Sequence, residues 1–467
     1  MKKPISLLLA AVLVLCLCAC AGSEEKHAGL QVGYGRKNIT PEESVPLNGY
    51  GNNAQRKSEN ILDLLYVTCI AFREGEETVL LITQDLLNTE PNLVPKAFEL
   101  ISEKTGVDKD RIMLCSTHTH SAPDVTLTNL PEIANYMDLY WKALVAAAEQ
   151  SIADLQPARL YGASTELTDM AFVRHYLMND GTYFGSNFGS TESGFKEHAT
   201  EKDANLRIVK ADRDGDNKDI MIMNWQAHPC YTGGVTETNV SADYIGVVRS
   251  KVEADTGMLF AFFQGAAGNQ TTNSKMPEFA HNLDCKQYGE KLAQSAIDLL
   301  PNMTEITGEG IVSIRYDMDA AVNHDDSELI VEALEVSALY KEGKSRDICN
   351  ARAIELGLSS QYHANAIVAR QNRPERADLR LDAVRIGDMA FIAVPYEMFS
   401  NHSLYIRENS PFEMTMISTS SNADAVYIPT IEAYEYGCYE SYVSYYAKGT
   451  GEAAADKLIE MLKDLKG

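Results

Sequence analysis

Two histidines, His118 and His120, stand two residues apart directly after the apolar residues 112–115. In extended backbone, residues i and i+2 point to the same face, so both imidazoles could meet one ligand at the end of a buried strand. Neutral imidazole is a good ligand for transition metals, and for zinc above all. The pair therefore predicts a metal site or, alternatively, two hydrogen-bonded structural histidines.

Two further strand ends carry possible metal ligands. His228 follows the apolar residues 220–225, and Glu397 follows the apolar residues 389–394. A histidine before a proline is otherwise a loop residue bonded to backbone, but the place of His228 matches that of His118. Glu397 would add a hard oxygen ligand. Asp243 precedes an expected helix, which it would cap, or it would orient a ligand imidazole.

A glycine-rich run at residues 264–273 follows another apolar strand. It is either a tight connection or a place where the backbone passes close to a ligand and its amides hold an oxyanion. The run lacks Gly-Lys-Ser/Thr, which argues against a phosphate-binding loop.

The elements that must position these residues alternate between strand-like and helix-like patterns. Strands are expected at 62–71, 78–83, 111–115, 205–211, 219–225, 258–264, 379–385 and 389–394, and helices at 93–105, 132–155, 244–256 and 285–300. This alternation predicts an α/β fold, with a mixed β-sheet core flanked by helices and the active site at strand ends. The charged helical segment around 325–370 is either an inserted subdomain or lid, or a surface helical hairpin.

Composition limits the possible partners. The chain has 467 residues, is 45% hydrophobic and carries a formal net charge of −25, so it is globular and too acidic to favour nucleic acid or anionic lipid. Six scattered cysteines follow the N-terminal segment without any Cys-x-x-Cys pair, so no disulfide framework is expected. Cys69 and Cys115 lie in apolar runs and should be buried thiols.

The N-terminus has the pattern of an export signal. Two lysines precede an apolar run at 5–17, which is short for a membrane span. The following Leu-Cys-Ala-Cys is similar to a bacterial lipobox and predicts lipid attachment to Cys20. We therefore expect a signal peptide at 1–19, a lipidated tether at 20–30, and an exported protein anchored to the cell membrane by its lipid, facing outside the cytoplasm.

Taken in order, several segments resemble the catalytic N-terminal domain of the neutral/alkaline non-lysosomal ceramidases. The most specific is Thr-His-Thr-His-Ser at 117–121, and the others are 32–41, 47–50, 224–228, 264–273, 395–397 and 439–440. The resemblance implies one hydrolase domain at 31–467. It also implies a zinc-dependent (Zn2+) amidohydrolase that uses a metal-activated water to cleave an N-acyl amide, namely ceramide into a sphingoid base and a fatty acid.

The resemblance also assigns roles to individual residues. It implies a zinc site formed by His118, His228, Glu397 and Tyr427, of which the tyrosine rests on the resemblance alone. His120 would then transfer a proton to the leaving amine instead of binding the metal. The remaining expected site residues are Asp243, positioning a histidine, Thr271 as a further catalytic residue, and Arg174, Gly268 and Asn269 at the substrate.

The chain also departs from the family pattern. Thr271 and Asn269 stand where ceramidases have serine and aspartate, Ala-Pro-Asp at 122–124 replaces Gly-Pro-Gly, and no segment remains for a C-terminal immunoglobulin-like domain. The substrate-facing loops have therefore changed more than the metal site. Two alternatives follow. One is a metal-dependent ester or amide hydrolase of acylated sugar or cell-envelope material, and the other is a non-catalytic solute-binding lipoprotein.

Overall fold

The computed structural model describes residues 29–51, 55–423 and 426–467, in which two β-sheets pack face to face. The expected signal peptide, Cys20 and most of the tether lie outside these residues. The larger sheet has the order β14-β12-β11-β6-β1-β3-β4-β5, with β16 paired to β6, and the smaller has the order β17-β18-β19-β21. Both contain parallel and antiparallel pairs, so the expected mixed α/β fold is confirmed.

The strands of the larger sheet are β1 (Gln31–Asn38), β3 (Tyr66–Glu74), β4 (Glu77–Gln84), β5 (Ile112–Ser116), β6 (Gln156–Glu166), β11 (Asn205–Arg213), β12 (Ile220–Trp225), β14 (Leu259–Gln264) and β16 (Thr304–Ile306). Those of the smaller sheet are β17 (Ile311–Ala321), β18 (Arg376–Ile386), β19 (Met389–Ala393) and β21 (Met414–Ser418). Short strands include β7 (Phe172–Val173), β15 (Gln270–Thr271), β20 (Glu397–Met398) and β22 (Tyr427–Ile428).

Alternation along the strands explains the layers. In β4 and β5, Leu81 and Met113 face the smaller sheet, whereas their neighbours Leu80 and Ile112 face the helices. Period-two burial of this kind places one strand between two apolar cores. Where the sheets meet, the rings of Phe263 and of Phe391 in the smaller sheet lie 5.0 Å apart, edge to face.

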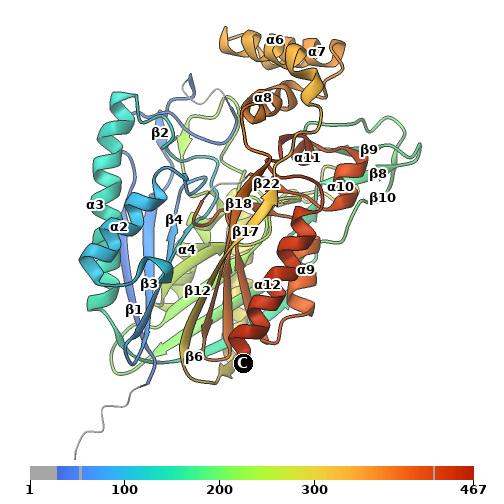
Figure 1. Ribbon diagram of the computed structural model, residues 1–467. Helices are drawn as coiled ribbons and strands as arrows, with labels where there is room; N and C mark the ends of the chain where they lie inside the picture. Colours follow the sequence, from blue (N-terminus) through green and yellow to red (C-terminus); the bar gives the residue numbers. More distant parts are fainter. Residues whose placement is uncertain (1–28, 52–54, 424–425) are drawn as a thin grey trace, which may run out of the picture.

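Helices cover both outer faces, giving four layers (Figure 1). The larger sheet carries α2 (Val94–Thr105), α3 (Pro131–Ala153), α4 (Tyr244–Thr256) and α5 (Cys285–Leu299), and the smaller carries α9 (Ser400–Glu408) and α12 (Thr450–Lys466). Glycine in β1 permits the close approach of α3, because a Cβ atom on Gly35 would lie 2.0 Å from the carbonyl oxygen of Ala147. No helix in the described ranges is long and apolar enough to span a membrane.

The helical segment expected around 325–370 is a three-helix unit inserted between β17 and β18. It consists of α6 (Ile330–Lys341), α7 (Arg346–Glu355) and α8 (Gln361–Arg370) and stands at the top of Figure 1. The unit has an apolar cluster of its own, built around Val336, Cys349 and Ile367. It is therefore an inserted subdomain and not a surface hairpin.

Some sequence-based boundaries and elements were wrong. The strand expected from residue 62 begins only at Tyr66, because the Asp63 carboxylate instead accepts hydrogen bonds from Ser241 and from the Ala242 amide. The long strands β6 and β17 were not predicted, since many of their residues are polar and half exposed. The six cysteines in the described part are free thiols, and Cys69 and Cys115 are buried, as expected.

Candidate active site

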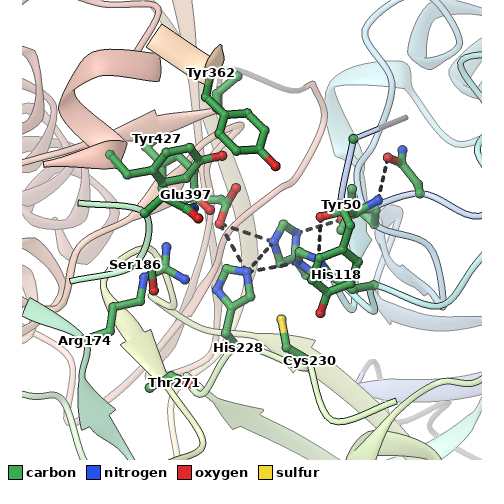
Figure 2. Close-up of a pocket in the computed structure, with 18 of the residues that line it drawn as sticks. Tyr50, His118, Arg174, Ser186, His228, Cys230, Thr271, Tyr362, Glu397 and Tyr427 are labelled. Atoms are coloured by element: carbon green, nitrogen blue, oxygen red, sulfur yellow. Dashed lines mark hydrogen bonds and ion pairs between the residues drawn. The ribbon is translucent and has the colours of Figure 1, made fainter. Parts of the chain in front are cut away.

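The expected metal ligands line one cavity of about 470 Å³ (Figure 2). His118 follows β5, His228 follows β12 and Glu397 opens β20 after β19, so three strand ends from two sheets meet there. β20 pairs with β22 in parallel, with Glu397 opposite Tyr427. This pairing brings the tyrosine beside the carboxylate, although 29 residues separate the two in sequence. The active site at strand ends is thus where the sequence placed it.

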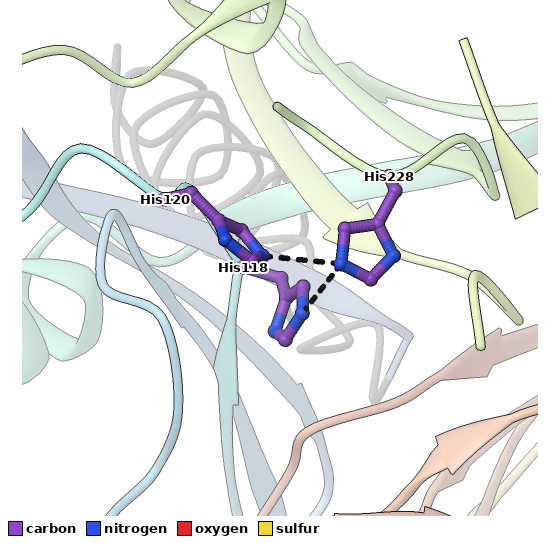
Figure 3. A group of neighbouring side chains, drawn as sticks. All are labelled: His118, His120 and His228. Carbon is purple, nitrogen blue, oxygen red and sulfur yellow. Dashed lines mark hydrogen bonds between the residues drawn. The ribbon is translucent and has the colours of Figure 1, made fainter. Parts of the chain in front are cut away.

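Three imidazoles meet nitrogen to nitrogen in this cavity (Figure 3). The Nε2 atom of His228 lies 3.1 Å from Nε2 of His118 and 3.1 Å from Nε2 of His120. The ligand atoms of the three side chains all lie within 4.8 Å of one another. His120, expected beside the metal, therefore offers its nitrogen to the same point as the two expected ligands.

The two histidines of the motif do not meet through extended backbone. His118 has φ of 67°, a left-handed conformation that non-glycine residues seldom adopt, so the chain turns there. The rings of His118 and His120 nevertheless approach to 5.1 Å, edge to face. The prediction that an extended strand places both imidazoles on one face was therefore wrong. A turn at His118 brings the two rings together instead.

Backbone carbonyls hold the outer nitrogen of each imidazole. Nδ1 lies 2.9 Å from the Leu87 oxygen in His118, 3.0 Å from the Gly49 oxygen in His120 and 3.2 Å from the Ala267 oxygen in His228. Because carbonyls only accept, each Nδ1 carries the proton.

The inner nitrogens form a cluster of neutral imidazoles. Burial, followed by the neighbouring His118, lowers the pKa of both His120 and His228 well below the ordinary value, so these two rings are neutral. Their Nε2 lone pairs converge on a point where a positive charge is needed to offset mutual repulsion. A bound cation would supply that charge.

Glu397 adds an oxygen to the same cluster. Its Oε2 atom lies 3.2 Å from His118 Nε2 and 3.8 Å from His228 Nε2, and within the described residues this buried oxygen accepts no hydrogen bond. A buried carboxylate oxygen without a donor is costly unless a cation compensates it. The combination of imidazole nitrogen and carboxylate oxygen fits zinc.

Tyr427 lies beside this donor set. Burial, followed by the nearby Glu397 carboxylate, raises the pKa of its hydroxyl well above the ordinary value. The Arg174 guanidinium stands over its ring at 5.6 Å and acts in the opposite direction. Figure 2 shows Tyr427 next to Glu397, with Arg174 below them. The assignment of Tyr427 as a fourth ligand stays a prediction.

A buried chain of polar groups fixes Arg174. Its Nε donates to Oε1 of Glu440 at 2.9 Å, and the other carboxylate oxygen lies 2.9 Å from Nε2 of His175. His175, Cys438 and Glu440 could also be grouped as a metal site, but the Glu440 oxygens and both His175 nitrogens are already hydrogen-bonded, the second nitrogen to Tyr436. We therefore interpret this group as the support that holds Arg174 in the cavity.

Replacing Glu440 by glutamine should destabilise the protein in a pH-dependent way. Burial alone would raise the Glu440 pKa, but His175 and Arg174 outweigh it and lower the pKa from its ordinary 4.5 to about 2. The stabilisation is therefore complete above pH 4.5 and is lost as the pH falls toward 2. Urea unfolding at neutral pH should show a loss of about 3–5 kcal/mol, as expected when a buried ion pair is broken.

The control for this variant is Glu435→Gln, which removes an exposed carboxylate 3.6 Å from Lys448. It should change stability by less than about 1 kcal/mol. A difference between wild type and Glu440→Gln that does not shrink in acid would show that charge on Glu440 is not the cause.

Gly268 and Asn269 do not face the substrate, contrary to the sequence-based assignment. The Gly268 amide donates to the Met398 carbonyl, and its own carbonyl accepts from Arg174. Both side-chain atoms of fully buried Asn269 are bonded to Ser400, at the start of α9. Since these groups are used to join the glycine-rich run to β20 and α9, they are not available to an oxyanion. Thr271, in contrast, does line the cavity.

Asp243 does not orient an imidazole. Its carboxylate accepts from the amide and hydroxyl of Thr232, at 2.7 and 3.0 Å, and from the Tyr244 amide, where it caps α4. Burial raises its pKa to about 6. Asp243 therefore fixes the loop after His228 and caps α4, which was the first of the two roles expected from the sequence.

Several residues that line the cavity were not predicted from the sequence. Its lining includes Tyr50, Lys275, Arg346, Tyr362 and Tyr439. They come from loops, from the inserted helices and, for Tyr439, from the helix Tyr439–Val443. No local spacing distinguishes them among the 23 tyrosines and 41 basic residues of the chain. Only the segments at 47–50 and 439–440 carried a signal, through the family resemblance.

Comparisons with known proteins agree with this arrangement. Residues 30–294 match the family described as neutral/alkaline non-lysosomal ceramidase, N-terminal. The fold is similar to the crystal structure of neutral ceramidase from Pseudomonas aeruginosa, with a TM-score of 0.70 and 19% identity, over 94% of this chain and 74% of that one. It is also similar to a ceramidase complexed with C2, with a TM-score of 0.69 and 18% identity, over 94% and 75% of the two chains. Since the family match covers more than half of its length, the chain belongs to the neutral/alkaline non-lysosomal ceramidase family and is a hydrolase of that type.

Proposed function

We propose that this hydrolase cleaves an N-acyl amide bond with the help of a zinc ion, and that ceramide is the substrate class to which its family points. The observation that carries the proposal is the convergence of three imidazole nitrogens and a buried carboxylate oxygen in one cavity. Zinc would be held by His118, His228 and Glu397, with Tyr427 beside them. The relatives named as ceramidases support the bond type.

The chain itself supplies the groups that bind and move protons. Zinc, when bound, would lower the pKa of water to about 7 and polarise the scissile carbonyl. His120 is neutral, with Nδ1–H fixed on Gly49, so its Nε2 can accept a proton from the attacking water and deliver it to the leaving amine. The Thr271 hydroxyl lines the cavity and can bond the amide. Arg174, held by Glu440, steadies the Tyr427 ring.

Metal analysis combined with an amide assay tests the proposal. Purified protein should hold close to one zinc ion per chain and hydrolyse a fluorogenic N-acyl amide, and chelation should remove both properties until zinc is restored. Folded protein that takes up no metal at saturating zinc would contradict the proposal.

The two alternatives are weakened to different degrees. A solute-binding lipoprotein has no reason to bring His118, His228 and Glu397 to one point, yet these residues lie together. Hydrolysis of acylated sugar or envelope material keeps support from the many polar side chains in the cavity lining. A panel of ceramide, acylated sugars and N-acyl amino acids separates the two hydrolytic functions.

We also propose that the protein is exported and anchored to the outer side of the cell membrane through lipid on Cys20. The support is the lipobox-like Leu-Cys-Ala-Cys after the apolar run. Replacing Cys20 by serine should move the protein from the membrane fraction to the soluble fraction, and unchanged membrane association would contradict the anchor.

A further inference from the structure

The charge of the cavity is opposite to that of the whole protein. The chain has 66 acidic and 41 basic residues. The cavity lining nevertheless contains the cationic side chains of Arg174, Lys275 and Arg346, and one carboxylate, Glu397, which belongs to the expected metal site. A cleft lined by one sign of charge concentrates ligands of the opposite sign.

Lys275 and Arg346 form no ion pair with an acidic side chain among the described residues. Lys275 lies 5.8 Å from the ring centroid of Phe184. Arg346 donates to the Tyr50 carbonyl at 3.2 Å and stands over Tyr362 at 5.6 Å. On the same helix α7, by contrast, Arg352 is bonded to Glu335 and Glu355. The charge of Arg346 is therefore directed to the cavity and is not neutralised on the surface.

Arg174 differs from these two residues because Glu440 neutralises it. It still affects Lys275. After desolvation of the amine, the charge of Arg174 is the next cause that lowers the Lys275 pKa, and the Glu440 carboxylate partly opposes it. A negative group placed between the cationic side chains and the histidine cluster would relieve this repulsion.

The lining contains few aliphatic side chains. Leu87 and Val426 are its aliphatic side chains, and the rest are polar groups, glycines and the hydroxyl-bearing rings of tyrosines. Pockets that bind apolar ligands are instead lined mainly by hydrophobic side chains. What distinguishes the cavity is therefore its charged and polar groups, which suit a polar or charged part of a substrate.

We propose that the amide hydrolysed in this cavity carries an anionic group, a carboxylate or a phosphate, and that Lys275 and Arg346 select it by charge. The inference rests on the proposed amide hydrolysis and narrows its substrate class. An N-acyl amino acid and a phosphorylated ceramide are two sources of the same chemistry. A neutral ceramide lacks it.

Three substrates with one acyl chain test the proposal: N-octanoyl glycine, octanoyl ceramide bearing a phosphate, and neutral octanoyl ceramide. With zinc-loaded full-length protein, kcat/KM should be at least about tenfold higher for one of the anionic amides than for the neutral one, since a bond to a charged group is worth roughly a factor of 10 to 100. The better of the two anionic amides identifies the source. Added salt should reduce the preference.

Variants test whether Lys275 and Arg346 cause the preference for anionic amides. Lys275→Gln and Arg346→Gln should each lower kcat/KM for the anionic amide about tenfold, mainly through KM, and should lower it much less for the neutral amide. Arg346→Lys keeps the charge and should retain most of the preference. The matched control is Lys218→Gln, which removes an exposed lysine from the turn before β12, at the end of that strand opposite His228.

Failure of this inference can be distinguished from failure of the proposed function. Equal turnover of neutral and anionic amides would overturn the inference and leave the amidase intact. If no amide is hydrolysed, the amidase is wrong, and calorimetric binding of the two anionic amides decides the inference. Binding that Lys275→Gln weakens would support an anion-selective site, whereas no binding would overturn it.

Discussion

Replacing His228 by alanine should remove zinc and activity together. His228 Nε2 is the nitrogen shared by the cluster, at 3.1 Å from both His118 and His120, and its Nδ1 is held by the Ala267 carbonyl. Loss of a direct ligand should weaken metal binding by more than the roughly 10- to 100-fold typical of groups that only support a ligand. Zinc content after dialysis and kcat/KM at saturating zinc measure the two effects.

A second histidine provides the control for this variant. His324 lies outside the cavity and contacts the Pro374 carbonyl at 3.3 Å. Its replacement by alanine should leave zinc content and turnover at the wild-type level. Full activity in the His228→Ala protein without bound metal would refute metal-dependent catalysis in this cavity.

The change Glu397→Gln should separate metal binding from folding. Because Oε2 of Glu397 accepts no hydrogen bond in the described structure, the metal-free protein loses no such bond when the oxygen becomes an amide nitrogen. Metal binding, in contrast, loses a negative charge 3.2 Å from His118 Nε2. We expect zinc affinity to fall at least about 100-fold, which corresponds to about 2.7 kcal/mol, while metal-free stability stays nearly unchanged.

Thermal unfolding with and without zinc tests this expectation. Zinc should raise the melting temperature of wild type and should have much less effect on Glu397→Gln, because a ligand stabilises only the state that binds it. A large loss of stability in the metal-free variant would show that Glu397 is a structural residue. Equal zinc-dependent shifts in both proteins would exclude it as a ligand.

Sequence reasoning succeeded where the signal was local. His118, His228 and Glu397 each follow a short apolar run, and such a run predicts a buried strand whose end opens at a sheet edge. The strands expected at 78–83 and 111–115 are likewise present, as β4 and β5. Family membership was also carried by short segments, above all residues 117–121.

Sequence reasoning failed where the role of a residue depends on a partner far away in the chain. Gly268 and Asn269 lie in a run that could hold an oxyanion, but Met398 and Ser400, about 130 residues later, take up their hydrogen-bonding groups. Asp243 could have reached an imidazole, but Thr232 occupies its carboxylate. The sequence did not identify Lys275 and Arg346 as cavity residues. The sequence around a basic residue shows neither where its charge points nor whether an acidic side chain neutralises it.

The sequence by itself determined the family, the α/β fold and three strand ends that carry possible metal ligands. The tertiary structure alone decided how they meet. A left-handed turn at His118, backbone carbonyls on each Nδ1 and the parallel pairing of Glu397 with Tyr427 create the site. The physical reason is range: burial and strand pattern follow from neighbouring residues, whereas the direction of a lone pair and the balance of charge in a cavity follow from groups that lie tens to hundreds of residues apart in the chain.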